Sequence, residues 1–259
     1  MRKNPMLAIF TTVFIDLLGF GILIPVFPLL ITDGPFRVTP DGWSFTQGMI
    51  MLGWLQAIYP FCMFIAAPIL GQLSDRHGRR PVLALSIFGT AIGYVLFAIG
   101  ISTGNLPLLF AARGLDGLTG GNLAVAQAAI GDISTHENRA KNFGYMGAAF
   151  GMGFIVGPYL GGKLSSPSVS FYGLFDTPHW FGATTPFWFA AILALLNCTA
   201  VLTTFPETIK EKFHGGKIRL GQSLNNVVNG FKSDRLRVIL LSSFLFSAGF
   251  TFFTTFFGV

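Results

Sequence analysis

Long uncharged runs constrain this chain more than any other feature of its sequence. From Pro81 to Ala112 there is no Asp, Glu, Lys or Arg. A helix needs about 20 apolar residues to cross the hydrocarbon core of a bilayer, because each residue rises about 1.5 Å and the core is about 30 Å thick. Seven segments meet this requirement, at about residues 6–31, 47–73, 81–102, 106–130, 143–164, 185–205 and 238–259. The sequence therefore predicts an all-α integral membrane protein.

The composition agrees with a membrane location. Charged residues make up 11% of the chain and hydrophobic residues 52%, whereas an ordinary soluble domain is about 25% charged. The first apolar run is too long for the hydrophobic core of a signal peptide, and no small-residue cleavage site follows it. We therefore expect the first segment to remain in the protein as a membrane helix.

The basic residues divide the connections between these helices into two sets. Most of the 17 Lys and Arg residues lie at the N-terminus, after the second and fourth helices, and in residues 206–237, and only Arg37 and Lys163 lie in the opposite connections. Cytoplasmic loops carry the excess of Lys and Arg. The sequence thus predicts a multi-pass protein of the plasma membrane, the inner membrane in bacteria, with a cytoplasmic N-terminus. The net charge of +6 then reflects topology and lipid contact, and no nucleic-acid partner is expected.

The long connection after the sixth helix divides the chain. It contains apolar residues at helical spacing, namely Leu220, Leu224, Val227, Val228 and Phe231. An amphipathic surface helix fits this pattern, and a plain linker fits it equally well. We predict a six-helix transmembrane bundle at 1–205, a cytoplasmic linker at 206–237 and the first helix of an incomplete C-terminal bundle at 238–259.

The turn GQLSDRHGRRPVL concentrates charge between the second and third helices. Gly78 permits the positive φ of a tight connection. Asp75 at a helix C-terminus, and Arg79 and Arg80 at a helix N-terminus, have the wrong sign for the local helix dipole. We therefore expect Asp75 to cap another helix and the arginines to reach Asp132. The charges would then hold the cytoplasmic helix ends together in one conformation; the alternative is that they only orient the chain.

Three charged residues lie inside the predicted spans. Asp16 lies about 15 Å along the first helix, where a charged side chain costs at least about 2.5 kcal/mol and must face a partner or water. Arg113 and Asp116 are three residues apart and share a face of the fourth helix. We interpret all three as proton-coupling and transport residues, with Asp16 as the first candidate; a static ion pair is the alternative for Arg113 and Asp116. Asn122 and Gln127 are further candidates for substrate contact.

The fifth helix carries a face of small residues. Gly153, Gly157 and Gly161 are spaced by four, so they share a face on which another helix backbone can approach closely. Pro158 removes one backbone donor beside this face. Each glycine costs about 1 kcal/mol of helix propensity relative to Ala, and close packing would offset that cost. The face serves packing alone, or packing together with a role in transport.

Several motifs resemble those of the major facilitator superfamily. The signature G-x-L-x-D-R-x-G-R-R of that family appears at Gly71, Leu73, Asp75, Arg76, Gly78, Arg79 and Arg80. The first, fourth and fifth helices resemble the tetracycline-efflux branch of drug/proton antiporters in the stretches FIDLLGFGILIPVFPLL, ARGLDGLTGGNLAVAQAAIGDIS and GAAFGMGFIVGPYLGG. The resemblance covers residues 6 to about 205.

The resemblance implies two six-helix bundles, alternating access, and export driven by proton entry. It also implies that G-x-x-x-G-P-x-x-G-G, which ends at Gly161 and Gly162, marks antiporters and lies where the two bundles meet. We therefore expect the N-terminal six-helix bundle plus a seventh transmembrane helix of a truncated twelve-helix fold, lacking its C-terminal half. Tetracycline exporters carry an acidic residue in helix three where this chain has Gly93, which argues against tetracycline itself as substrate.

These features predict a secondary active transporter that exports a small, amphipathic molecule or drug in exchange for protons. Its expected partners are the lipid bilayer and the missing C-terminal half, and the complete protein is expected to be monomeric. A major facilitator importer of a sugar or metabolite is the alternative. A seven-helix receptor would place its N-terminus outside, contrary to the Lys and Arg pattern. No enzyme activity, cofactor or metal is expected, because the four His residues are scattered over loops without ligand spacing.

Overall fold

The computed structural model describes residues 5–32, 34–167, 170–171, 175–176, 178, 181–209 and 228–256. The chain forms two compact units, Met1–Phe213 and His214–Val259. The elements of the first unit are α1 (Pro5–Leu23), η1 (Phe27–Leu30), α2 (Phe45–His77), α3 (Arg79–Ser102), α4 (Leu106–Thr119), α5 (Asn122–Ile133), α6 (Arg139–Leu164), β1 (Ser170–Phe171), β2 (Phe175–Asp176) and α7 (Thr185–Thr204). The second unit contains α9 (Asp234–Phe256), with an apolar stretch at Leu236–Gly249.

Among the described residues, five helices are long and apolar enough to cross a membrane: α1, α2, α3, α6 and α7. The predicted fourth span corresponds to two helices, α4 and α5, which are interrupted at Gly120 and Gly121. Glycine is a poor helix former, and these two residues lie against α2: a Cβ on Gly121 would be 2.9 Å from the Cα of Ala67. Two adjacent glycines thus favour an interruption that the hydropathy pattern did not predict, and the absence of a Cβ at Gly121 lets α2 approach closely.

The first predicted span is shorter than expected. We predicted one segment from about residue 6 to 31, whereas α1 ends at Leu23 and a short 3-10 helix follows. Pro25 explains the end of the helix, because proline lacks a backbone donor and disfavours the helical conformation of the preceding residue. The predicted outer loop after α6 contains a small antiparallel hairpin, β1–β2, which the sequence analysis did not predict.

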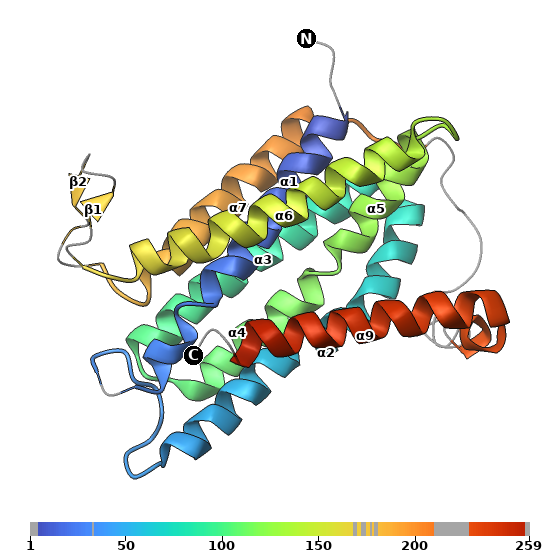
Figure 1. The fold of residues 1–259 in the computed structure, drawn as a ribbon. Helices are drawn as coiled ribbons and strands as arrows, with labels where there is room; N and C mark the ends of the chain where they lie inside the picture. Colours follow the sequence, from blue (N-terminus) through green and yellow to red (C-terminus); the bar gives the residue numbers. More distant parts are fainter. Residues whose placement is uncertain are drawn as a thin grey trace. The chain divides into compact units, whose positions relative to one another are not determined.

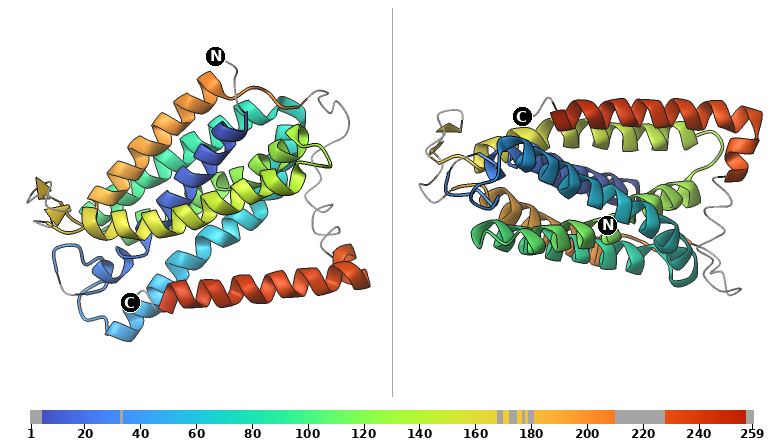
Figure 2. Two further views of the ribbon diagram at one scale, coloured as in Figure 1. Left: turned by 45° about the horizontal axis from the view of Figure 1, so that its top comes forward. Right: turned by 90° about the horizontal axis from the view of Figure 1, so that it is seen from below.

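The first unit is built around α1. This helix packs against α6 and α7, α3 packs against α4 and α7, and α2 packs against α4 and α5. Figures 1 and 2 show α1 running between α6 and α7. Large apolar side chains point away from the bundle, among them Trp54, Leu85, Ile155 and Leu196. An apolar exterior around a partly polar interior is the arrangement that a bilayer requires.

The helix ends follow local sequence signals. Ser44 and Gln47 form a capping box at the start of α2, in which the Ser44 N–H donates to Gln47 Oε1 at 2.8 Å. The side chain of Asn105 accepts from the Leu108 N–H at 3.0 Å and caps α4. The break predicted between the third and fourth helices is therefore present.

The predicted linker is described only at its two ends. Residues 206–209 follow α7 and residues 228–232 are helical. Leu220, Leu224 and Val227 lie outside the described residues. The choice between an amphipathic helix and a plain linker, and the division at residues 205 and 237, stay predictions.

Candidate functional site

Polar residues of α1, α2, α4 and α5 meet inside the first unit. We call Asp16, Tyr59, Arg113, Asp116 and Asn122 the central cluster. Nη1 of Arg113 lies 3.1 Å from Oδ2 of Asp116, and these residues are only 3% and 5% exposed. Nδ2 of Asn122 donates to Oδ2 of Asp16 at 2.6 Å. Two carboxylates and one guanidinium therefore lie inside the bundle, where Arg113 and Asp116 are buried and Asp16 is partly buried.

Each carboxylate of the central cluster has a different partner. Asp116 pairs with Arg113, as the spacing on the fourth helix predicted. Asp16 bonds to the neutral amide of Asn122, and within the described residues no ion pair joins Asp16 to Arg113. The arginine charge is thus balanced by Asp116, and within the part of the chain that the structure describes no ion pair is formed by Asp16.

Arg113 keeps unused hydrogen-bonding capacity. Its guanidinium lies over the ring of Tyr59, 4.6 Å from the ring centroid, in the geometry of a cation–π interaction. Nε of Arg113 is buried and has no hydrogen-bond partner among the described residues. The guanidinium of Arg113 can therefore donate a hydrogen bond to a further anionic group, because not all of its N–H groups are in use.

Gly93 explains how Asp116 fits between two helices. A Cβ at Gly93 would lie 3.2 Å from the Cβ of Asp116, so α3 and α4 are in direct contact here. One turn away, Thr90 and Thr119 lie within hydrogen-bonding distance at 3.2 Å. The position in helix three where the resemblance implied an acidic residue thus faces a carboxylate supplied by helix α4. Gly93 departs from the pattern of tetracycline exporters, and its contact with Asp116 was not predicted from the sequence.

The substrate-contact candidates lie on different faces of α5. Asn122 is buried and its amide binds Asp16, whereas Gln127 is exposed. Substrate contact by either residue stays a prediction.

A second ionic group joins the charged turn to α5. We call Ser74, Asp75, Arg79 and Asp132 the turn cluster. Arg79 Nη1 lies 2.6 Å from Asp75 Oδ1 and donates to Ser74 Oγ at 2.6 Å, and its Nε lies 2.9 Å from Asp132 Oδ2. The expected contact between an arginine and Asp132 is therefore present, through Arg79. Its role in holding the helix ends together stays a prediction.

Glu207, which follows α7, caps the third helix. Its carboxylate accepts from the backbone N–H groups of Arg79 and Arg80, at 2.8 and 3.3 Å. A negative charge at a helix N-terminus is favourable. We expected Asp75 to cap a helix, whereas among the described residues Asp75 pairs with Arg79 and Glu207 is the cap. Glu207 was not predicted as a cap from the sequence, because it lies 127–128 residues from its partners.

The other residues of the turn signature differ in their backbone conformation and surroundings. Gly78 has a positive φ of 109°, as predicted for the tight connection. A Cβ on Gly71 would meet nothing within 4 Å. Among the charges, Arg79 makes the contact with Asp132, while Arg76 and Arg80 lie outside the turn cluster.

The glycine face of α6 packs on α1. A Cβ on Gly153 would lie 2.6 Å from the Cβ of Leu17, and one on Gly157 would lie 2.7 Å from the Leu18 carbonyl oxygen. Pro158 and Gly161 lie against the same helix, whereas the nearest contact of Gly162 is Pro25 at 4.0 Å. The predicted close packing is therefore present, within the bundle. A role where two bundles meet stays a prediction.

We expect Gly157→Ala to destabilise the first unit, because the added methyl group would force α1 and α6 apart. Overpacking of this kind costs about 1–3 kcal/mol, which equals or exceeds the gain in helix propensity of about 1 kcal/mol. The matched control is Gly147→Ala on the same helix, where a Cβ meets nothing within 4 Å. Thermal unfolding in detergent should show a lower midpoint for the first variant and an equal or higher midpoint for the second. A lower midpoint for both would contradict the packing argument.

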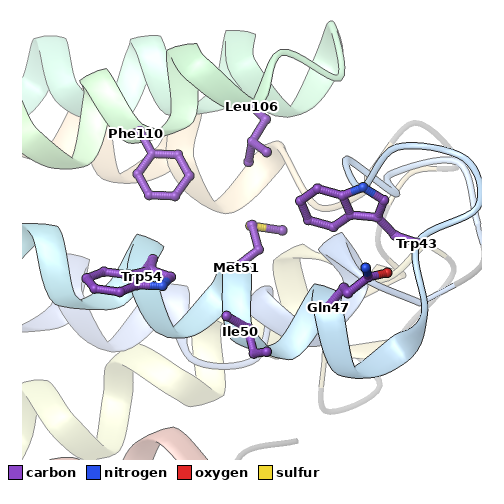
Figure 3. Close-up of a pocket in the computed structure, with 7 residues that line it drawn as sticks. All are labelled: Trp43, Gln47, Ile50, Met51, Trp54, Leu106 and Phe110. Carbon is purple, nitrogen blue, oxygen red and sulfur yellow. The ribbon is translucent and has the colours of Figure 1, made fainter.

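An apolar hollow lies apart from both clusters. It has a volume of about 490 Å³ and lies between α2, α4 and the segment before α2. Its walls are Trp43, Gln47, Ile50, Met51, Trp54, Leu106 and Phe110 (Figure 3). No residue of the central cluster lines it. Among the described residues, no group of three His, Cys, Asp or Glu side chains is placed to hold a metal ion.

An apolar bundle exterior around a buried charged cluster is the arrangement of a polytopic membrane protein. Comparison with known proteins gives the family. The chain belongs to the Major Facilitator Superfamily, whose model matches residues 9–259. The resemblance and the fold class expected from the sequence are thereby confirmed.

Two curated relatives are tetracycline resistance proteins. The class C protein of Escherichia coli is 41% identical over 167 residues, which cover 64% of this chain and 39% of the relative. The class H protein of Pasteurella multocida is 32% identical over 246 residues, which cover 95% of this chain and 55% of the relative. The chain thus spans about half the length of the curated relatives it matches.

A solved structure has the same fold. The crystal structure of the human organic anion transporter MFSD10 matches with a TM-score of 0.65 and 23% identity. The match covers 84% of this chain and 51% of that chain. At this identity the likeness concerns the fold alone.

Proposed function

We propose that this chain forms one half of a secondary active transporter that exports a small, amphipathic molecule by alternating access, in exchange for protons. One observation carries the proposal: Asp16 is placed inside the bundle beside the neutral amide of Asn122, while the charge of Arg113 is balanced by Asp116. An isolated carboxylate charge is costly in an apolar environment. Asp16 is therefore suited to hold a proton in one state and release it in another.

The balance of charges supports one exchangeable proton. The central cluster contains two carboxylates and one guanidinium, so one excess negative charge remains when both acids are ionised. A helix movement that brings Arg113 to Asp16 would stabilise the ionised Asp16 and leave Asp116 as the acid that needs a proton. Competition of the two acids for one arginine gives the two states that coupled exchange requires.

The substrate proposed is a drug-like amphipathic molecule. The relatives named above are tetracycline resistance proteins, which supports export of an antibiotic or similar compound. Gly93 separates this chain from the pattern of tetracycline exporters, although Asp116 supplies a carboxylate to the same helix contact. We therefore propose drug-like amphipathic molecules as the class of substrate, and this proposal does not include tetracycline itself.

The test is transport by the complete protein, expressed with any coding sequence that follows Val259 in its gene. An efflux-deficient bacterial host expressing it should tolerate higher concentrations of some amphipathic toxic compounds. Inverted membrane vesicles should then accumulate the protective compound only while a pH gradient is present. Accumulation without a pH gradient would contradict proton exchange, and uptake into intact cells would favour an importer.

The proposed orientation places the N-terminus and the turn cluster in the cytoplasm of a bacterial cell. We expect a reporter that is active only in the cytoplasm to work when fused after Lys217. The same reporter inserted near Thr177 should be inactive, because that loop would lie outside. Activity in the opposite pattern would reverse the orientation.

We propose that the turn cluster is a latch that holds the cytoplasmic helix ends together. In the complete protein, Asp75→Asn should slow transport while abundance in the membrane stays near that of the unchanged protein. The Asp75 side chain is half exposed, so loss of its ion pair costs at most about 1 kcal/mol of stability. Asp41→Asn, in the exposed outer loop, is the matched control and should change neither property. Loss of abundance in step with transport would instead indicate that Asp75 only orients the chain.

A further inference from the structure

A second hollow lies between the starts of α1 and α6, and we call it the α1–α6 hollow. Its volume is about 570 Å³. The side chains that line it come from both helices, among them Met6, Leu7 and Phe10 of α1 and Lys141, Asn142 and Tyr145 of α6. The wall formed by α1 is therefore apolar, whereas the wall formed by α6 carries a positive charge and polar groups.

The α1–α6 hollow faces away from the central cluster. Tyr145 is nine residues before Phe154 on α6, which is a rotation of about 180° at 3.6 residues per turn. The ring of Phe154 packs on Phe20 with 5.8 Å between the centroids, and Phe20 packs on Tyr59 of the central cluster at the same distance. The hollow thus opens on the opposite side of α6, where Leu7 and Tyr145 are 63% and 43% exposed.

The hollow lies at the same end of the bundle as the turn cluster. Leu7 is the third residue of α1, and Lys141 is the third residue of α6. Nδ2 of Asn142 donates to Oγ of Ser134 at 2.9 Å, and Ser134 follows Asp132 of the turn cluster by two residues. In the orientation proposed above this is the cytoplasmic end, where anionic lipid headgroups give the membrane surface a negative potential.

Two basic side chains at the start of α6 are unfavourably placed for their own helix. Arg139 and Lys141 lie in the first turn, where positive charge opposes the helix dipole, and this turn contains no acidic residue. Within the described ranges, neither side chain forms an ion pair. Nζ of Lys141 lies 6.0 Å from the ring centroid of Tyr145, at the edge of the range of a cation–π interaction. An anion from outside the bundle would give these charges the partner that they lack.

The sequence around the hollow is basic. Residues 135–145 contain Arg139 and Lys141 against one acidic residue, Glu137. Arg2 and Lys3 precede α1 in the sequence, and no acidic residue occurs before Asp16. Each Lys or Arg near a membrane surface raises the affinity for anionic lipid about fivefold. The charge balance therefore favours an anionic ligand over a neutral one.

We propose that the α1–α6 hollow binds an anionic phospholipid, with its phosphate at Lys141 and the start of an acyl chain against Leu7 and Phe10. A lipid has the chemistry of both walls, since its headgroup is charged and its chain is apolar. Tyrosine at the level of the headgroups is typical of membrane proteins, and Tyr145 has this place beside Lys141. The proposal rests on the membrane location of the bundle and is independent of proton exchange.

The test is the affinity of the complete transporter in detergent for its first bound lipid, measured by native mass spectrometry. The probes are phosphatidylglycerol and phosphatidylcholine with the same acyl chains. We expect tighter binding of phosphatidylglycerol. Lys141→Gln should weaken that binding about fivefold, the worth of one basic residue, and leave phosphatidylcholine binding unchanged. Lys163→Gln, at the other end of α6, is the matched control and should change neither affinity.

Three results would overturn the proposal. Equal affinity of the unchanged protein for the two lipids would leave Arg139 and Lys141 only the role of orienting the chain. An equal loss in Lys141→Gln and Lys163→Gln would show that general surface charge, and not the hollow, attracts the lipid. Soluble glycerol phosphate that binds as tightly as phosphatidylglycerol would show that the apolar wall takes no part.

Ionic strength gives a test that needs no variant. Raising it should weaken the binding of phosphatidylglycerol and leave that of phosphatidylcholine nearly unchanged, because salt screens exposed charges. Binding of phosphatidylglycerol that does not respond to salt would contradict the role of Lys141 even if Lys141→Gln failed to fold. Since lipid binding is measured without transport, its absence refutes this proposal alone, whereas transport that is independent of the pH gradient refutes only the proposed function.

Discussion

Replacing Asp16 with Asn is expected to abolish pH-gradient-driven uptake in inverted vesicles while substrate binding survives. Asparagine has nearly the same shape and can still bond to Asn122, which now donates to Asp16 at 2.6 Å. The variant should therefore insert and fold. It has no exchangeable proton, so the pH gradient can no longer drive accumulation. One charge moved through 100 mV is worth about 2.3 kcal/mol, which corresponds to an accumulation of about 50-fold.

The expected accumulation ratio of the Asp16→Asn protein is therefore about one at any pH gradient. Binding of the compound, measured in detergent, reports separately on whether the site is intact. Asp41→Asn controls for the loss of an acidic residue outside the bundle. Uptake that keeps its dependence on the pH gradient in Asp16→Asn would exclude Asp16 as the coupling carboxylate. Asp116, or a residue of the other bundle, would then hold that role.

The sequence predicted the contacts that follow from the spacing of two residues on one helix or from an unfavourable charge at a helix end. Arg113 and Asp116 share a helix face at a spacing of three, so their pairing followed from helix geometry. The unfavourable position of Arg79 at a helix N-terminus predicted an acidic partner elsewhere, and Asp132 is that partner. Charge that is misplaced for its own helix was thus informative about tertiary structure.

Contacts between distant segments needed the structure. Asn122 lies 106 residues from Asp16, and nothing in either helix alone indicates which faces meet. Glu207 lies just after a helix end, where no periodic pattern places its side chain. The interruption of α4 and α5 was also missed, because a hydropathy window averages over Gly120 and Gly121.

The ion pair of Arg113 and Asp116 is expected to carry the largest stability effect in the bundle. Arg113→Met leaves Asp116 without a cation in a region where it is 5% exposed. Breaking a buried pair in this way typically lowers the free energy of unfolding by about 3–5 kcal/mol. Removing both charges, as Arg113→Met with Asp116→Asn, should restore most of that loss, because no unpaired buried charge remains. Thermal or denaturant unfolding of the single and double variants gives the coupling between the two residues.

Transport by the double variant distinguishes a static ion pair from a functional one. If the pair only stabilises the fold, the double variant should recover uptake together with stability. If Arg113 is the cation for which Asp16 and Asp116 compete, the double variant should regain stability yet remain unable to couple uptake to the pH gradient, because Asp16 then has no arginine to bind in its ionised state. We expect the second result. Recovery of coupled uptake in step with stability would assign Arg113 and Asp116 to structure alone and leave Asp16 to exchange its proton without an arginine.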